Sequence, residues 1–269
     1  MASLPPSETL ILEIDDGWLQ IRFNRPEARN ALSDEMASDL MGVLQRVAED
    51  RSVRGITLRG EGNIFCAGGD LKGFQKSLAG TFTQDEAEAM SRSAGALFAR
   101  INSMPQVVVA IVEGAAIAGG LGMACCADFV IAKEDAKFSL TETMLGISPA
   151  QIAPYVIQRT GQMTARRMML TGAKFTAKEA HALGIVDIVA PSTEGLAKAA
   201  DEIKASVRRC APGANAVTKE IALASGHLNR DEMIAFAAKG FAKCMLSDEG
   251  REGILSFVEK RKPSWAKSD

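Results

Sequence analysis

Two glycine-rich segments are the parts of this sequence whose residue types could do chemistry. Residues 65–71 (FCAGGDL) follow one apolar run, and residues 113–122 (EGAAIAGGLG) follow another. Glycine after a strand lets the backbone approach a ligand closely and point N–H groups at it. Two such loops can supply the two convergent N–H donors that an oxyanion hole requires. The alternative is that each segment is only a tight turn.

Other chemical motifs are incomplete in this sequence. Residues 120–125 (GLGMAC) are close to a dinucleotide-binding GxGxxG, but Cys125 replaces the last glycine and the preceding strand ends too early. There is no Gly-Lys-Ser/Thr of a P-loop and no Gly-x-Ser-x-Gly of a hydrolase elbow. His181 and His227 are far apart, so we expect neither a Ser-His-Asp triad nor a metal centre.

The elements that must position the loops alternate between strand and helix. Strands are predicted at 10–14 and 18–23, joined by an Asp-Gly turn, and again at 53–58 and 106–112. Helical spacing of apolar residues predicts a helix over 33–50, and the capping box at 83–86 predicts another that ends near Asn102. This order is typical of an α/β domain with crossover connections.

The chain becomes mostly helical after Ser148. Ser148, Pro149 and Gln151 have the types and spacing of a helix N-cap, first helical position and capping partner. Capping signals recur at 176–179 and 229–232, and Pro212 and Gly213 separate two of the predicted helices. A single α/β core followed by a helical C-terminal part is therefore expected.

Composition excludes several classes of protein. Of 269 residues, 47% are hydrophobic and 24% charged, which is ordinary for a globular domain. A net charge of −2 with 5% aromatic residues argues against a nucleic-acid surface. Glu113 and Asp128 interrupt the most apolar stretch, so no membrane span is predicted, and residues 1–6 carry no signal-peptide pattern. Five cysteines without CxxC spacing indicate reduced thiols and a cytoplasmic location.

The glycine loops belong to a longer pattern that resembles a known family, the crotonase superfamily of enoyl-CoA hydratases and isomerases. The similarity covers about residues 10–265 and is carried, in order, by 23–32 (FNRPEARNAL), 65–71, 113–114, 119–120, 137–138, Glu142, 170–172 (LTG) and 257–263 (FVEKRKP). It implies a spiral of ββα units over residues 1–200 and a helical oligomerisation region over residues 201–269. It also implies a trimer or a dimer of trimers.

The resemblance implies a site for a coenzyme A thioester, with no cofactor besides the coenzyme A of the substrate. Its oxyanion N–H groups fall on Gly69 and Gly119. The residues expected to bind coenzyme A are Ala28, Arg29, Ala31, Ala67, Asp70 and Leu71, together with Phe257 and Lys260, which would reach a neighbouring subunit's site.

One departure from the family pattern bears on the reaction. Hydratases of this family carry two catalytic glutamates; the second falls on Glu142, but the first falls on Gly122, which has no side chain. Three outcomes are open: hydration of a 2-enoyl thioester by Glu142 alone, Δ3,Δ2-isomerisation by Glu142, or a non-catalytic coenzyme A-binding protein. Gly122 is also expected to enlarge the pocket beside the β-carbon, so that a branched or carboxylated acyl group could fit.

Three polar residues near the loops remain ambiguous. Asp70 is expected to hold the first loop, and Glu113 could be equally structural. Gln151 has a sufficient explanation as a capping residue; alternatively its amide positions a water or a polar substrate tail, which would point toward glutaconyl-type esters.

Overall fold

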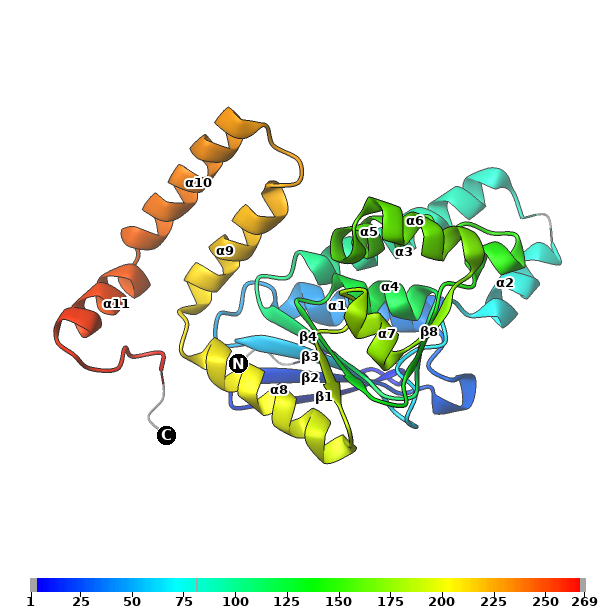
Figure 1. The fold of residues 1–269 in the computed structure, drawn as a ribbon, viewed down its shortest axis with the longest axis horizontal. Coiled ribbons are helices and arrows are strands. Elements are labelled where there is room, and N and C mark those ends of the chain that lie inside the picture. The colour runs from blue at the N-terminus through cyan, green and yellow to red at the C-terminus, as the bar shows by residue number, and fades with distance from the viewer. Residues whose placement is uncertain (1–3, 81, 267–269) are drawn as a thin grey trace.

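A six-stranded sheet forms the centre of the computed structural model, which describes residues 4–80 and 82–266 (Figure 1). Residues 1–3, part of the segment without a signal-peptide pattern, lie outside the described residues. The strand order is β1-β2-β3-β4-β6-β9, and every neighbouring pair is parallel except β1 and β2. The strands are β1 (Leu10–Asp15), β2 (Trp18–Phe23), β3 (Gly55–Gly60), β4 (Val107–Val112), β6 (Phe129–Lys133) and β9 (Ile188–Ala190).

Helices cover both faces of this sheet. α1 (Asp34–Val47) and α3 (Gln84–Asn102) bury Leu40, Leu44 and Ile101 against one face, in the main hydrophobic core. α8 (Thr193–Arg208) packs Leu196 and other apolar residues against Trp18, Ile111 and Ile131 on the opposite face. The α/β domain with crossover connections that the sequence predicts is confirmed.

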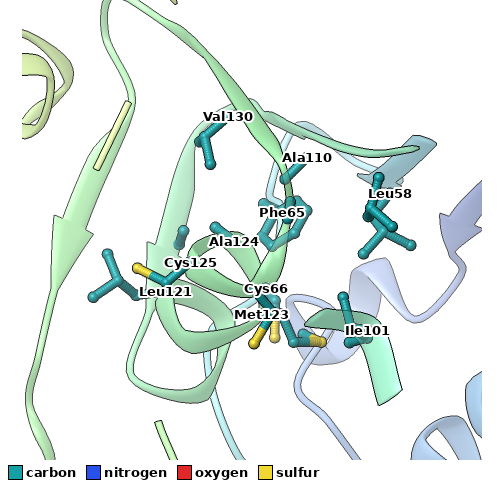
Figure 2. Close-up of a cluster of buried hydrophobic side chains, with 14 of the residues drawn as sticks. Leu58, Phe65, Cys66, Ile101, Ala110, Leu121, Met123, Ala124, Cys125 and Val130 are labelled. Carbon is teal, nitrogen blue, oxygen red and sulfur yellow. The ribbon is translucent and has the colours of Figure 1, made fainter. Parts of the chain in front are cut away.

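α4 (Gly119–Cys126) runs through the middle of the core and has no exposed face. Figure 2 shows its side chains Leu121, Met123 and Cys125 packed among residues of the surrounding strands and helices. Burial raises the pKa of the Cys125 thiol to about 12, so this cysteine is a packing residue rather than a nucleophile. All five cysteines are free thiols.

A second, three-stranded sheet lies beside α4. Its order is β5 (Ala115–Ile117), β7 (Lys137–Ser139), β8 (Lys174–Thr176), with β5 and β7 parallel. Strands of three residues are too short to show a periodic pattern, and the sequence did not predict them.

Three of the four capping signals that the sequence contains mark the start of a helix. Capping boxes at Thr83, Thr176 and Asn229 begin α3, α7 (Ala177–Ala182) and α10 (Arg230–Met245) as predicted. The predicted N-cap at Ser148 is wrong, because residues 150–152 form a turn and the helix begins at Ala153. The other helices are α2 (Leu71–Leu78), η1 (Pro26–Ala28), η2 (Glu142–Leu145), α5 (Ala153–Thr160), α6 (Gln162–Thr171), α7 (Ala177–Ala182), α9 (Pro212–Ala224), α10 (Arg230–Met245) and α11 (Asp248–Val258).

α9, α10 and α11 form an arm that projects from the body of the molecule (Figure 1). Lys219 of α9 anchors it, because its ammonium group bonds Asp128 and the carbonyl oxygen of Gln106. The division placed at residue 200 stays a prediction; α8 runs continuously through this position. Within the described residues, no helix combines the length and the apolar character needed to cross a bilayer.

The arm carries many exposed apolar side chains. They are Ile234, Phe236, Phe241, Met245, Leu246, Ile254, Leu255, Phe257 and Val258. So large an apolar surface is unusual for a monomer and marks an interaction site.

We therefore predict a trimer-based oligomer in which this surface is covered. Sedimentation velocity at micromolar concentration should give a species of at least three chains, and Phe241→Lys should shift it toward smaller species. Lys239→Ala, on the same helix, is the control and should leave the distribution unchanged. A stable monomer of the unaltered protein would contradict the prediction.

Candidate functional site

Three parallel chain segments carry the candidate site on one edge. Cys66 pairs with Ala116 in a parallel bridge, and β5 pairs in parallel with β7. Parallel segments leave a sheet at the same edge. In this register Cys66, Ala116 and Phe138 are aligned. Gly69 and Gly119 are each the third residue after this level and Glu142 is the fourth, so all three lie in loops that leave the aligned segments at the same edge.

The N–H groups of Gly69 and Gly119 are free and close to each other. Gly69 N lies 3.9 Å from the point where a Cβ on Gly119 would be. Among the described residues, neither N–H donates to a protein acceptor, although the neighbouring N–H of Asp70 binds Leu32 O. Gly119 is the first residue of α4, whose N-terminus adds a favourable field for negative charge. This arrangement can hold a developing oxyanion.

Ala118 has a rare backbone conformation at this point. Its φ of 48° and ψ of −119° are unusual for any residue with a side chain, and such strain costs of order 1–3 kcal/mol. The conformation turns the chain from β5 into α4, and Ala118 N donates to Ser139 O at 2.8 Å. The hydrogen bond from Ala118 N to Ser139 O therefore helps to hold the strained conformation of the residue that precedes Gly119.

Two phenyl rings flank the glycine N–H groups. The Phe74 ring of α2 lies where a side chain on Gly69 would be, with Cζ 2.9 Å from a Cβ at that position. The Phe98 ring of α3 is 3.9 Å from the corresponding point at Gly119. The surroundings of the candidate oxyanion hole are consequently apolar, which strengthens electrostatic interactions there.

Glu142 is a buried carboxylate whose Oε2 has no hydrogen-bond partner among residues 4–80 and 82–266. Burial raises the pKa of Glu142, and a hydrogen bond from its own backbone only partly offsets this effect. A carboxylate that is destabilised in this way accepts a proton more readily than one in water. The predicted catalytic glutamate therefore has the environment of a proton-transfer group.

Ile152 occupies the space next to Gly122. A Cβ on Gly122 would overlap Ile152 Cγ2 and lie 2.6 Å from Ile152 Cβ. The expectation that Gly122 enlarges the pocket is therefore wrong, because a buried isoleucine that the sequence did not single out fills this space. An apolar side chain therefore lies beside Gly122, the position at which the crotonase resemblance implies a first catalytic glutamate.

The predicted coenzyme A-binding backbone lies alongside the first glycine loop. Ala67 N donates to Arg29 O at 3.0 Å, and Leu32 N donates to Gly68 O at 2.7 Å. Arg29 has a left-handed φ of 55° at the end of η1. Residues 28–32 are thus fixed beside residues 67–70, and the structure brings Ala28, Arg29, Ala31 and Ala67 together.

Asp70 and Glu113 have structural partners. Asp70 bonds the Arg25 guanidinium at 3.1 Å and accepts the N–H groups of Lys72 and Gly73 at the start of α2. Glu113 is paired with Arg59 and accepts the Thr193 hydroxyl. Asp70 therefore holds the first loop, as predicted, and its neighbour Leu71 is exposed.

Phe257 and Lys260 do not reach this site within one chain. Both lie at the end of α11, on the far side of the arm from α4 (Figure 1), and the Phe257 side chain is 85% exposed. Their predicted contact with coenzyme A of a neighbouring subunit stays a prediction.

Comparison with known proteins decides the family. The sequence matches the family model of enoyl-CoA hydratase/isomerase over residues 13–268. This chain belongs to that family. AtuE of Pseudomonas aeruginosa is 45% identical over 97% of this chain and 100% of its own, with a TM-score of 0.93. An enoyl-CoA hydratase/isomerase from Marinobacter aquaeolei is 41% identical over 97% of this chain and 100% of its own, also with a TM-score of 0.93. Enoyl-CoA hydratase EchA19 of Mycobacterium tuberculosis is 31% identical over 98% of this chain and 99% of its own.

The crotonase resemblance and fold are thereby confirmed for this enoyl-CoA hydratase/isomerase family member. Sequence reasoning missed Ile152, Phe74 and the strained Ala118. The only sequence signal for a side chain packed on α3 was Gly95 in the interior of the helix, where glycine is unfavourable.

Glu142→Gln is predicted to abolish proton transfer but stabilise the fold. At pH 7 the native state must hold a desolvated carboxylate whose pKa is raised, so the neutral amide should increase the melting temperature. In the unaltered enzyme, kcat/KM should fall as pH falls through the raised pKa, above the ordinary 4.5. Calorimetry and a pH–rate profile measure both; Glu134→Gln in an exposed turn is the control. An unchanged rate in Glu142→Gln would show that another group transfers the proton.

Gly122→Glu is predicted to destabilise the protein rather than restore a second catalytic acid. Overlap with Ile152 should cost about 1–3 kcal/mol of unfolding free energy. Ile152→Ala vacates the same space, so the double variant should be more stable than the sum of the two single effects. Urea unfolding of the four proteins gives the coupling energy. Additive effects would mean that the two positions do not share the space.

Proposed function

We propose that this protein is an enoyl-CoA hydratase that adds water to a 2-enoyl-CoA thioester using Glu142 as its single carboxylate. The observation that supports the proposal most directly is the pair of free N–H groups of Gly69 and Gly119 on the same edge as buried Glu142, whose Oε2 has no partner among the described residues. Enoyl-CoA hydratase EchA19, whose similarity to this chain covers 99% of its own length, supports the same reaction.

The chemistry follows from these groups. The thioester oxygen accepts both glycine N–H groups, which polarises the conjugated double bond. Glu142 takes a proton from water as the water oxygen bonds to C3, and the electrons of the double bond move to the thioester oxygen as an enolate. Glu142 then returns the proton to C2, which gives a 3-hydroxyacyl thioester. A raised pKa suits a group that both accepts and donates a proton.

Isomerisation is the second candidate, and Ile152 is the observation that favours it. A water molecule near C3 would lose a hydrogen-bonding partner where Ile152 covers Gly122. A lone Glu142 can instead remove a proton from C2 of a 3-enoyl thioester and deliver it to C4, with the same enolate held by Gly69 and Gly119. A non-catalytic coenzyme A-binding protein is the third possibility.

The proposal includes the rest of the coenzyme A site. Backbone groups of Ala28, Arg29, Ala31 and Ala67 would hold the nucleotide and pantetheine part beside the first loop. Phe257 and Lys260 would complete the site from a neighbouring chain, in a trimer or a dimer of trimers. The exposed position of both residues on the apolar arm supports this arrangement.

Product analysis with separate 2-enoyl-CoA and 3-enoyl-CoA esters tests the reaction. We expect a 3-hydroxyacyl-CoA from the 2-enoyl ester and no product with Glu142→Gln. Conversion of only the 3-enoyl ester, without uptake of water, would establish isomerisation instead. Saturable binding of acetoacetyl-CoA without turnover of either ester would favour the non-catalytic protein.

A further inference from the structure

The turn before α5 places two neighbouring side chains against two different helices. Gln151 packs on α3 at Gly95, where a Cβ would lie 2.8 Å from Gln151 Cδ. Ile152 packs on α4 at Gly122. Each helix therefore has an interior glycine at the point of contact, although glycine is less favourable there than alanine. The two glycines make room for these two side chains.

The Gln151 amide is held in place but retains hydrogen-bonding capacity. Its Nε2 donates to Ser91 Oγ at 3.0 Å, and Ser91 lies one turn before Gly95 on α3. Since the predicted capping role is wrong, this contact is what orients the amide. Oε1 has no hydrogen-bond partner among the described residues. It is the Gln151 atom that lies closest to Gly95, and it is not sealed from solvent.

Two independent contacts place Gln151 near the reacting end of the substrate. Phe98, three residues after Gly95 on α3, lies beside Gly119. Gly122, which contacts Ile152, is three residues after Gly119 on α4. Three residues of helix span about 4.5 Å. The point on α3 that Gln151 contacts is therefore one helical turn from Phe98, whose ring lies beside Gly119, and the point on α4 that Ile152 contacts is one turn from Gly119 itself.

The acyl chain begins at that carbonyl, and its described neighbours are largely apolar. Phe74, Phe98 and Ile152 suit a hydrocarbon, whereas an oriented amide among them does not. A site with a hydrogen-bonding group discriminates strongly against an analogue that lacks the matching group, because the protein group is then left unpaired.

We propose that Gln151 determines specificity by hydrogen-bonding a polar group carried by the acyl chain beyond the C2–C3 double bond: Oε1 accepts from a hydroxyl, or the second N–H of Nε2 donates to a carbonyl or carboxyl oxygen. Ser91 is the positioning residue that fixes the amide. The inference rests on the proposed function, since it takes the thioester oxygen to lie at Gly69 and Gly119.

The test compares acyl chains of equal length that end in methyl, hydroxyl or carboxyl groups. For each, kcat/KM is measured with the 2-enoyl-CoA ester, and Kd is measured calorimetrically with the saturated ester. The unaltered protein should prefer at least one polar chain by about tenfold, as expected for one good hydrogen bond. Gln151→Met, which keeps the length of the side chain, should remove this preference, and Ser91→Ala should weaken it. Gln158→Met, the same change at an exposed position of α5, is the control.

The ratio between chains distinguishes specificity from a merely structural role, which would lower all rates together. A preference that Gln151→Met leaves unchanged would overturn the inference, as would equal kcat/KM and Kd values for all three chains in the unaltered protein. Turnover of the methyl-ended ester in that second case would leave the proposed function intact. Absence of all turnover would instead count against the proposed function, and the Kd values would still decide the role of Gln151.

Discussion

Parallel alignment of three short segments is the constraint on which this site depends. Cys66 N donates to Ala115 O at 3.1 Å, Ile117 N donates to Cys66 O at 3.0 Å, and Ala118 N donates to Ser139 O at 2.8 Å. These bonds fix the register of the three segments, so that two backbone donors and a carboxylate lie in loops that leave them at the same edge. The large sheet and the buried helix α4 make that register rigid.

The same region combines several features that disfavour folding. Ala118 is strained, Glu142 is a desolvated carboxylate whose Oε2 has no partner in the described part of the chain, and α3 and α4 each contain an interior glycine. Each of these features is local, whereas the core that surrounds α4 is extensive (Figure 2). Functional sites commonly concentrate such strain, and the packed scaffold compensates for it.

Local signals predicted local structure well. The Asp-Gly turn between β1 and β2 and the capping boxes at Thr83, Thr176 and Asn229 depend on neighbours in sequence, and all are present. The signal at Ser148 failed because the Gln151 side chain bonds Ser91, sixty residues away in the chain. Glycine loops could be identified from sequence, and the family pattern assigned Glu142. No pattern in one sequence could show that Ile152 would fill the space at Gly122, since that contact depends on tertiary packing.

The anchor of the arm has a consequence for the order of events during synthesis. Asp128 already accepts the N–H of Val108, so the acceptor for Lys219 is organised by the body alone. Chains generally fold from the N-terminus as they are made, and every loop of the site precedes Lys219 by more than one helix. We infer that the arm docks onto a finished body. The apolar surface of α10 and α11 is then made after the body that carries the site.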